Sequence, residues 1–327
     1  MKKRVFSGTR ATGRLHLGNY LGAVKGYIAL QENPKYECVY MAVDLHTITT
    51  PYKPDTLSPA TKDIIIDYLA AGLNPEKAII TAQSLVPEHT YLAFLFSSVV
   101  SMARMMHLPT FKEKARQHPQ NVTMALLNYP LLMAADILAY KADLVPAGID
   151  QEPHIEVTRE ISRKMNKRFG LSFPETKRFA VAGEYIPSLL GDGKMSKSVK
   201  GSFINLTDDL KTINKRLALV PTDLGKAKTL PSQGGVANLL ILVELFEGKS
   251  KREKYEKQYL GKGIRYSQLK TDLAKAIYQD LKPIREKREK LAKDKQYVDK
   301  VIVTGAKKAR LIASKTLKEV KEKMGLE

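Results

Sequence analysis

The chain has 327 residues, 43% of them hydrophobic, so it can bury a sizeable core, and its length predicts two domains. No apolar run is long enough to cross a membrane, and the single cysteine, Cys38, excludes an intramolecular disulfide framework and a multi-cysteine metal site. The basic start Lys2-Lys3-Arg4 is followed by only a short apolar stretch, so we expect no export and a cytoplasmic protein.

The formal net charge of +20 is unevenly distributed. Residues 201–327 hold 29 basic and 16 acidic residues, a net of +13, whereas residues 1–200 hold 25 and 18, a net of +7. The shorter C-terminal part is therefore more basic per residue, as expected for a surface that meets a nucleic acid. A solubilising lysine-rich surface would have the same composition, so the charge indicates RNA or DNA without proving it.

The first 200 residues alternate between predicted strands and predicted helices. Short apolar runs predict strands at 5–7, 39–43, 78–81 and 144–147. Apolar spacing of three and four predicts helices at 20–28, 56–72, 91–106 and 123–140. This alternation predicts an α/β fold with a parallel sheet and with ligands at the carboxyl ends of its strands. The polar residues that follow the predicted strands or lie in their loops are His16, Asp44, His46, Asp150 and Gln151.

A turn-rich loop with glycines at 8, 13 and 18 lies between the first predicted strand and the first predicted helix. This layout presents backbone amides and the positive end of a helix to phosphate. Gly13 and Gly18 have the spacing of a P-loop, but Asn19 and Tyr20 stand where that motif has Lys and Ser or Thr. The dinucleotide fingerprint G-x-G-x-x-G is absent as well. A nucleotide bound here must therefore be held in another way.

Beyond residue 200 the sequence predicts helices only. Thr207 is expected to cap the first of them, and Pro283 is expected to kink a later one. The predicted apolar helix faces lie at 210–220, 236–246, 269–284 and 309–324. We therefore predict a boundary near residue 200, between an α/β domain at 1–200 and an all-helical domain at 201–327.

The segment Lys194-Met195-Ser196-Lys197-Ser198 follows Gly191-Asp192-Gly193. Two flexible point charges interleaved with hydroxyls suit a bulky anion that is released after reaction, such as pyrophosphate. Taken alone, such a segment is more often a solvated turn.

The segment Leu15-His16-Leu17-Gly18-Asn19, followed by Lys194–Ser198, resembles the paired signature of class I aminoacyl-tRNA synthetases. Other stretches resemble one family among them, the bacterial-type tryptophanyl-tRNA synthetases. They are residues 6–8, 44–49, 110–114, 129–138 and 148–151. The resemblance covers essentially the whole chain. It implies a Rossmann-like catalytic domain at 1–200 and a helical anticodon-binding domain at 201–327, whose terminal helix can pack back on the catalytic domain.

The family activates L-tryptophan with ATP, releases pyrophosphate, and transfers the amino acid to tRNA(Trp). The resemblance implies that Mg²⁺ accompanies ATP, held mainly by phosphates and water, since the sequence shows no carboxylate cage for it. It also implies a homodimer, and the apolar segment 92–106 fits a subunit contact.

For the ATP site, the resemblance implies catalytic roles for His16, Lys114, Lys194 and Lys197. The nucleotide contacts that it implies come from Arg10, Ala11, Thr12, Gly18, Asn19, Gly148, Ile149, Asp150, Ile186, Lys194, Met195, Ser196, Lys197 and Ser198. Arg10, Ala11 and Thr12 depart from the usual family pattern, in which a glutamine often stands at the position of Arg10.

For the amino acid, the resemblance implies that the Asp136 carboxylate accepts the indole N–H. The implied pocket consists of Phe6, Val43, His46, Tyr129, Met133 and Val145, with Gln151 at the amino or carboxyl end of the substrate. An aspartate inside the apolar run 131–138 costs several kcal/mol unless it has a partner, so Asp136 is the strongest candidate. We expect phenylalanine to leave this carboxylate unpaired, which can reject it by a factor of about 10⁴–10⁵.

The sequence leaves two alternatives open. A tyrosyl-type enzyme shares the fold and the Gly-x-Asp-Gln segment, although the stretch around Asp136 counts against it. A non-aminoacylating RNA-binding paralogue would explain the basic surface but not Lys194, Lys197 and Asp136. ATP–pyrophosphate exchange with each amino acid distinguishes the three.

Overall fold

The computed structural model describes residues 2–180, 186–191, 193–197, 199 and 201–327. The chain divides into two compact units. Unit 1 takes in residues 1–14, 25–182 and 291–327, and unit 2 takes in residues 15–24 and 183–290.

A parallel sheet of five strands lies inside unit 1. The strands are β1 (Lys3–Arg10), β2 (Tyr36–Val43), β3 (Ala78–Ala82), β4 (Leu144–Pro146) and β5 (Lys177–Phe179). Their order in the sheet is β3-β2-β1-β4-β5, so the strand order reverses at β1. Ligands of such sheets bind outside the carboxyl ends of the strands at that reversal. The predicted parallel α/β fold is therefore confirmed.

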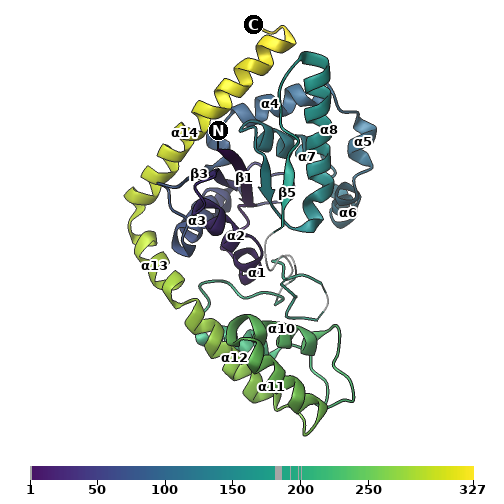
Figure 1. Cartoon of the computed structure of the whole chain (residues 1–327), viewed down its shortest axis with the longest axis vertical. Helices are drawn as coiled ribbons and strands as arrows, with labels where there is room; N and C mark the ends of the chain where they lie inside the picture. The colour runs from purple at the N-terminus through teal and green to yellow at the C-terminus, as the bar shows by residue number, and fades with distance from the viewer. Residues whose placement is uncertain (1, 181–185, 192, 198, 200) are drawn as a thin grey trace. The chain divides into compact units, whose positions relative to one another are not determined.

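Helices cover both faces of this sheet (Figure 1). On one face, Tyr40 of β2 stacks on Tyr27 of α2 (Lys25–Gln31), with ring centroids 4.6 Å apart, and Tyr68 of α3 (Pro54–Ala71) meets Tyr27 edge-on. The opposite face carries α4 (Glu88–Ser97), α7 (Met124–Leu138) and α8 (Glu152–Phe169).

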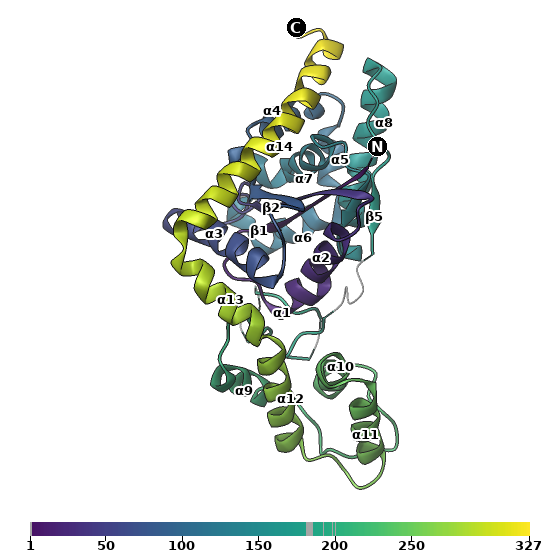
Figure 2. The same ribbon diagram turned by 60° about the vertical axis from the view of Figure 1, so that its left-hand side comes forward.

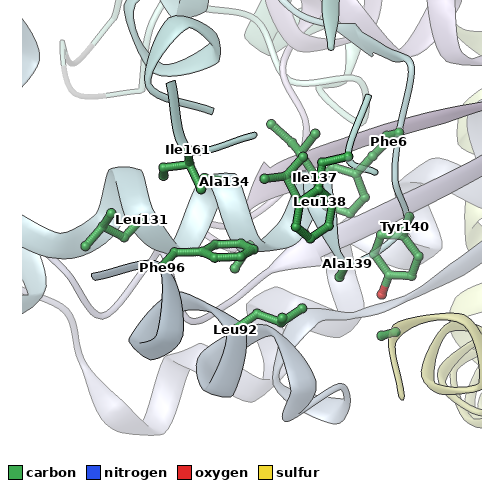
Figure 3. Packing of buried hydrophobic residues seen from close by; sticks show 14 of the residues in the cluster. Phe6, Leu92, Phe96, Leu131, Ala134, Ile137, Leu138, Ala139, Tyr140 and Ile161 are labelled. Atoms are coloured by element: carbon green, nitrogen blue, oxygen red, sulfur yellow. The ribbon is translucent and has the colours of Figure 1, made fainter. Parts of the chain in front are cut away.

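One apolar cluster joins that second face of the sheet to its helices (Figure 3). Phe6 of β1, Leu92 and Phe96 of α4, Leu138 of α7 and Ile161 of α8 are all buried members of it. Strands buried on both faces read as continuous apolar runs, and β2 has such a run at residues 38–43, which explains why it could be predicted.

The C-terminal helix α14 (Lys295–Met324) packs against β3, and Figures 1 and 2 both show it beside the sheet of unit 1. The Thr81 hydroxyl donates to the carbonyl of Ile302 at 2.9 Å. A Cβ atom on Gly305 would lie 2.0 Å from the carbonyl oxygen of Ile80. The helix backbone therefore approaches the strand backbone directly, which is why residues 291–327 belong to unit 1 and not to the second compact unit.

Unit 2 is helical and also takes in an N-terminal segment of ten residues, 15–24. The amide of Leu17 donates to the carbonyl of Ile204 at 2.8 Å, and the amide of Leu206 donates to the carbonyl of Leu15 at 3.2 Å. The helical elements of this unit are α1 (Leu17–Asn19), a π-helix (Tyr20–Val24), α9 (Leu210–Ala218), α10 (Gly235–Glu247), α11 (Lys249–Leu260) and α12 (Tyr266–Asp280), most of which Figure 2 labels. The helix α13 (Lys282–Lys293) begins in unit 2 and ends in unit 1.

Three details of the predicted helices were wrong. The helix predicted at 91–106 is two helices, α4 and α5 (Met102–Met106), because Ser98 bonds back to the carbonyl of Leu95 and Ser101 caps the second helix. Asp209, not Thr207, caps α9, since its carboxylate accepts from the amide of Thr212 at 2.7 Å. The kink expected at Pro283 is a break between α12 and α13 at Leu281.

The helix α6 (Pro109–Gln117) and a 3-10 turn after β4 (Ile149–Gln151) carry residues of the predicted site. Within the described ranges, no helix has both the length and the apolar character needed to cross a bilayer.

Candidate functional site

The two predicted signature segments come together inside unit 2. His16 bridges to Asn205, and the amide of Met195 donates to the carbonyl of Ile186 at 2.9 Å. A Cβ atom on Gly18 would lie 3.2 Å from the Cβ of Met195 and 3.0 Å from the ring of His16. Glycine at position 18 therefore lets the N-terminal segment approach the lysine segment closely.

His16 caps the short helix α1 and is uncharged. Its Nδ1 accepts from the amide of Asn19 at 3.3 Å, while the Asn19 side-chain oxygen accepts from the amide of His16 at 3.3 Å. Burial, together with the charges of Lys197 and Lys194, lowers the pKa of His16 to about 3. Since Nδ1 accepts, the neutral ring carries its hydrogen on Nε2 and is a neutral donor at that atom.

The lysine segment is anchored through its apolar and serine positions. Met195 is buried, whereas Lys194 is exposed and Lys197 is partly exposed. The amide of Ser196 donates to the Ser202 hydroxyl at 3.3 Å. Asn238 of α10 donates to the carbonyls of Ser188 and Gly191, at 2.9 and 2.6 Å. Ser202 and Asn238 were not predicted as site residues, and Ser198 lies outside the described residues.

In unit 1, Arg10 ends β1 at the strand reversal. Its Nη2 donates to the Thr50 hydroxyl at 2.7 Å, and the amide of the next residue, Ala11, donates to the Thr47 hydroxyl at 3.0 Å. The amide of Thr12 donates back to the carbonyl of Arg10, which closes a tight turn. The Nε atom of Arg10 is buried and has no hydrogen-bond partner among the described residues.

Lys114 of α6 lies over the ring of Tyr129 of α7, with its Nζ 4.4 Å from the ring centroid. Burial and the charge of Arg10 lower the pKa of Lys114 to about 8. The Tyr129 hydroxyl lies 2.6 Å from the Thr110 hydroxyl and 2.7 Å from Nε2 of His154. Thr110 and His154, neither of which was predicted as a site residue, thus fix the direction of the Tyr129 hydroxyl.

Asp136 is only 1% exposed and has three partners. His46 Nε2 lies 2.8 Å from its Oδ2, and Gln83 donates to its Oδ1 at 2.7 Å. Nδ1 of His89 lies 2.9 Å from Oδ1, away from the direction of a well-formed hydrogen bond. Burial raises the pKa of Asp136, but the bonds and charge interactions with His46 and His89 outweigh it and hold the pKa below its ordinary value. The carboxylate is therefore ionised.

This arrangement corrects one expectation about Asp136. The protein itself supplies partners to the carboxylate, so a substrate without an N–H would not leave it unpaired. Rejection by a factor of about 10⁴–10⁵ applies to a polar group that only the substrate satisfies. The discrimination at Asp136 must therefore be smaller than that estimate or must come from elsewhere in the pocket.

Tyr129, Met133 and Asp136 stand at i, i+4 and i+7 on α7 and so share one side of the helix. Phe6, Val43 and Val145 are buried residues of β1, β2 and β4. After β4, Gly148 begins a 3-10 turn in which Ile149 and Asp150 are exposed, and the Gln151 amide donates to the Asp150 carboxylate at 2.6 Å. These residues all belong to unit 1.

The residues implied for ATP thus divide between the units. Arg10 to Thr12, Lys114 and Gly148 to Asp150 belong to unit 1, whereas His16 to Asn19, Ile186 and Lys194 to Lys197 belong to unit 2. In the described part of the chain, no three histidine, cysteine, aspartate or glutamate side chains gather in a way that could hold a metal ion.

A protein-family model described as tRNA synthetases class I (W and Y) matches residues 1–282. The chain belongs to this family. Its relatives include a protein named tryptophan--tRNA ligase from Rickettsia conorii, 42% identical, with 99% of both chains covered. A protein of the same name from Clostridium tetani is 38% identical, with 99% of this chain and 96% of the relative covered.

Solved structures agree with this membership. Tryptophanyl-tRNA synthetase from Mycoplasma pneumoniae matches this class I synthetase with a TM-score of 0.86 at 30% identity, covering 100% of this chain and 99% of the other. The enzyme from Campylobacter jejuni, complexed with ADP and tryptophan, matches with a TM-score of 0.85 at 29% identity, covering 99% and 100%. The resemblance inferred from the sequence is therefore confirmed.

Proposed function

We propose that this synthetase activates L-tryptophan with ATP to form tryptophanyl-adenylate and pyrophosphate, and then transfers tryptophan to tRNA(Trp) with release of AMP. The observation that carries the choice of amino acid is Asp136, an ionised carboxylate buried beside aromatic and aliphatic side chains. An indole is a large apolar group with a single N–H donor, and it fits such an environment.

The reaction needs no nucleophile from the protein, because the substrate carboxylate attacks the α-phosphate of ATP. Lys194 and Lys197 bind the triphosphate and stabilise the negative charge that develops on the departing pyrophosphate. His16 donates from Nε2 as a neutral group, and Gly18 and Asn19 approach the nucleotide through their backbone. Lys114 supplies a further cation from α6.

In the amino-acid pocket, Asp136 accepts the indole N–H, and Phe6, Val43, His46, Met133 and Val145 form its walls. Tyr129 also belongs to this pocket, and Gln151 binds the amino or carboxyl end of tryptophan. Gly148, Ile149, Asp150 and Ile186 line the adenosine site, to which the turn of Arg10, Ala11 and Thr12 also contributes, as do Met195, Ser196 and Ser198 beside the two lysines.

Mg²⁺ enters with ATP, bound mainly by phosphate oxygens and water. When bound, the ion neutralises phosphate charge, and the lysines act beside it.

The macromolecular partners are tRNA(Trp) and a second copy of the chain. The helical region at 201–327, with its net charge of +13, is the proposed anticodon-binding domain, next to a catalytic domain at 1–200. We place this reaction in the cytoplasm, where its tRNA and ATP are available.

The test is ATP–pyrophosphate exchange with tryptophan, tyrosine and phenylalanine, followed by aminoacylation of tRNA(Trp). Exchange should depend on tryptophan. Exchange driven by tyrosine alone would establish the tyrosyl alternative, and RNA binding without any exchange would establish a non-aminoacylating paralogue. Asp136→Ala should raise the KM for tryptophan and relax the choice of amino acid with less effect on kcat.

A further inference from the structure

The Asp136 carboxylate is held unequally at its two oxygens. Oδ1 faces two side chains, Gln83 at 2.7 Å and His89 at 2.9 Å, whereas Oδ2 faces His46 alone at 2.8 Å among the residues that the structure describes. An ionised carboxylate accepts hydrogen bonds in about four directions. Gln83 takes one direction on Oδ1 and His46 takes one on Oδ2, whereas His89 lies close to Oδ1 off the direction of a well-formed hydrogen bond. Oδ2 therefore keeps a direction that no described residue takes.

The orientation of Gln83 is set by its other end. Its Oε1 accepts from the amide of Leu45 at 3.1 Å, directly after the end of β2. The NH₂ group must then face Asp136, because the two ends of an amide have opposite hydrogen-bonding roles. Gln83 thus connects the loop that carries His46 to the carboxylate.

The orientation of His89 is set by Tyr140. A carboxylate only accepts, so Nδ1 of His89, which faces it, carries the ring hydrogen. Nε2 of His89 lies 2.7 Å from the Tyr140 hydroxyl. Burial raises the pKa of Tyr140 well above its ordinary value, so the hydroxyl keeps its proton and donates it to Nε2. A directed chain of contacts then runs from Tyr140 through His89 to Oδ1, in which the Nδ1 hydrogen faces Oδ1 off the direction of a well-formed hydrogen bond.

The same tyrosine supports the apolar wall of the proposed pocket. Its ring stacks on Phe6 with centroids 5.5 Å apart and an angle of 7° between the planes. Figure 3 labels both side chains in the packed cluster. Phe6 also meets the ring of His89 edge-on at 6.5 Å. Tyr140 therefore touches both Phe6 and the group that holds Asp136.

We propose that Gln83, His89 and Tyr140 are positioning residues for tryptophan selection: Gln83 and His89 face Oδ1 of Asp136, Tyr140 orients His89, and Oδ2 is left to the indole N–H. This inference rests on the proposed function and adds residues that do not touch the substrate. Without the chain through His89, the carboxylate loses a partner on Oδ1, turns more freely and accepts the indole N–H less well. The variants should therefore lose recognition of the indole N–H and keep their selectivity for the size of the ring.

The experiment compares two amino acids that differ only at that position, L-tryptophan and β-(3-benzothienyl)-L-alanine, in which sulfur replaces the indole N–H. The readout is the ratio of their kcat/KM values in ATP–pyrophosphate exchange. Tyr140→Phe keeps the ring on Phe6 and removes only the hydroxyl. We expect it to lower the ratio about fivefold or more, the size of one weakened buried hydrogen bond, through a higher KM for tryptophan with kcat nearly unchanged.

His89→Leu should lower the ratio further, and His89→Asn, which keeps a donor near the place of Nδ1, should restore part of it. Phe96→Leu, a change in the same apolar cluster, is the matched control and should lower stability without changing the ratio. An unchanged ratio in folded Tyr140→Phe and His89→Leu would overturn the proposal, as would equal losses for both amino acids. If wild-type protein shows no tryptophan-dependent exchange, the proposed function itself fails.

A spectroscopic measurement covers the case in which the His89 variants do not fold. The chain contains no tryptophan, so the indole N–H of bound ¹⁵N-labelled tryptophan gives the only indole signal that comes from the complex in an NMR spectrum. Tyr140→Phe, which is nearly isosteric, should shift this signal, whereas Phe96→Leu should not. An unmoved signal in Tyr140→Phe would contradict the directed chain.

Discussion

At the scale of single residues, Arg10 and Lys114 place two positive charges near Tyr129. Burial of Lys114, followed by the charge of Arg10, lowers the pKa of this lysine to about 8. Below that pH Lys114 is charged, and as pH rises through it the charge is lost. The two positive charges repel one another in the free protein, which disfavours the charged form of Lys114. An anion bound between them, such as a carboxylate or phosphate of the substrates, would stabilise both charges.

The first prediction concerns Arg10→Gln, which introduces the residue common in the family. Removing the charge of Arg10 while burial remains should raise the pKa of Lys114. The alkaline fall in kcat/KM for ATP–pyrophosphate exchange should therefore move to higher pH. Arg10→Lys keeps the charge and should leave the fall where it is. A fall at the same pH in the glutamine variant would show that Lys114 does not limit activity there.

A second prediction separates chemistry from substrate binding. Lys197→Ala should reduce the rate of adenylate formation by about 10²–10³-fold, because its contact strengthens as charge develops on the leaving pyrophosphate. Pre-steady-state quenching measures this rate, and fluorescence or calorimetry measures tryptophan affinity, which should change little. Lys249→Ala, an exposed lysine at the start of α11, is the control. A comparable loss of tryptophan affinity in Lys197→Ala would remove the assigned role.

For Asp136, the sequence predicts that the buried carboxylate has partners but does not predict which residues they are. A carboxylate inside an apolar helical run had to be partnered, and this was predictable from the cost of burying a charge. The partners were not, because His46 stands 90 residues away and Gln83 stands 53 residues away in the chain. Only the fold brings the ends of β2 and β3 to the same helix, so the carboxylate was wrongly expected to depend on substrate alone.

At the scale of elements, predictability followed the strength of the apolar pattern. The strands β2 and β3 and the helix α7 are apolar over most of their length and were predicted, and β1 was predicted from its short apolar run at Val5 and Phe6. The helix α8 was not, because its buried side includes the polar residues His154, Thr158 and Ser162 beside only a few apolar ones. The strand β5 has three residues, Lys177–Phe179, and no buried one among them. Short or polar elements depend on neighbours that the local sequence does not name.

The third prediction uses the contact between α14 and β3. Alanine in place of glycine usually stabilises a helix interior by about 1 kcal/mol. Gly305→Ala should instead destabilise the protein by about 1–3 kcal/mol, because the added Cβ would overlap the carbonyl of Ile80 and push the helix off the strand. Urea unfolding followed by far-UV circular dichroism measures the change. Val303→Ala, at a half-exposed position of the same helix, should alter stability by less than about 0.5 kcal/mol. A stabilised Gly305→Ala protein would show that α14 does not rest on β3 in this way.

At the scale of the whole molecule, the change from strands to helices near residue 200 was visible in the sequence, but the composition of the compact units was not. Residues 15–24 join unit 2 through backbone bonds to residues 204 and 206, and α14 joins unit 1 through β3. An amphipathic pattern establishes that α14 has an apolar side and does not say what covers it. The domain boundary predicted near residue 200 reflects the local change from strands to helices. The two compact units instead reflect contacts between segments that lie far apart in the chain.

The last prediction concerns the proposed homodimer. The helices α4 and α5 bury Leu92 and Met105 in unit 1 but leave Phe94 77% exposed and Met102 65% exposed. Large apolar side chains exposed this far on neighbouring helices are typical of an interface. Phe94→Glu should place a charge in that interface and convert a dimer of twice 36.6 kDa into a monomer, which sedimentation at micromolar concentration measures.

Leu311→Glu, at a 67% exposed position of α14, is the matched control and should remain dimeric. A wild-type mass of one chain would contradict the dimer, and a dimeric Phe94→Glu variant would place its interface elsewhere. Because Phe94 lies outside the proposed catalytic residues, exchange activity measured on the monomeric variant also tests whether each chain forms the adenylate alone.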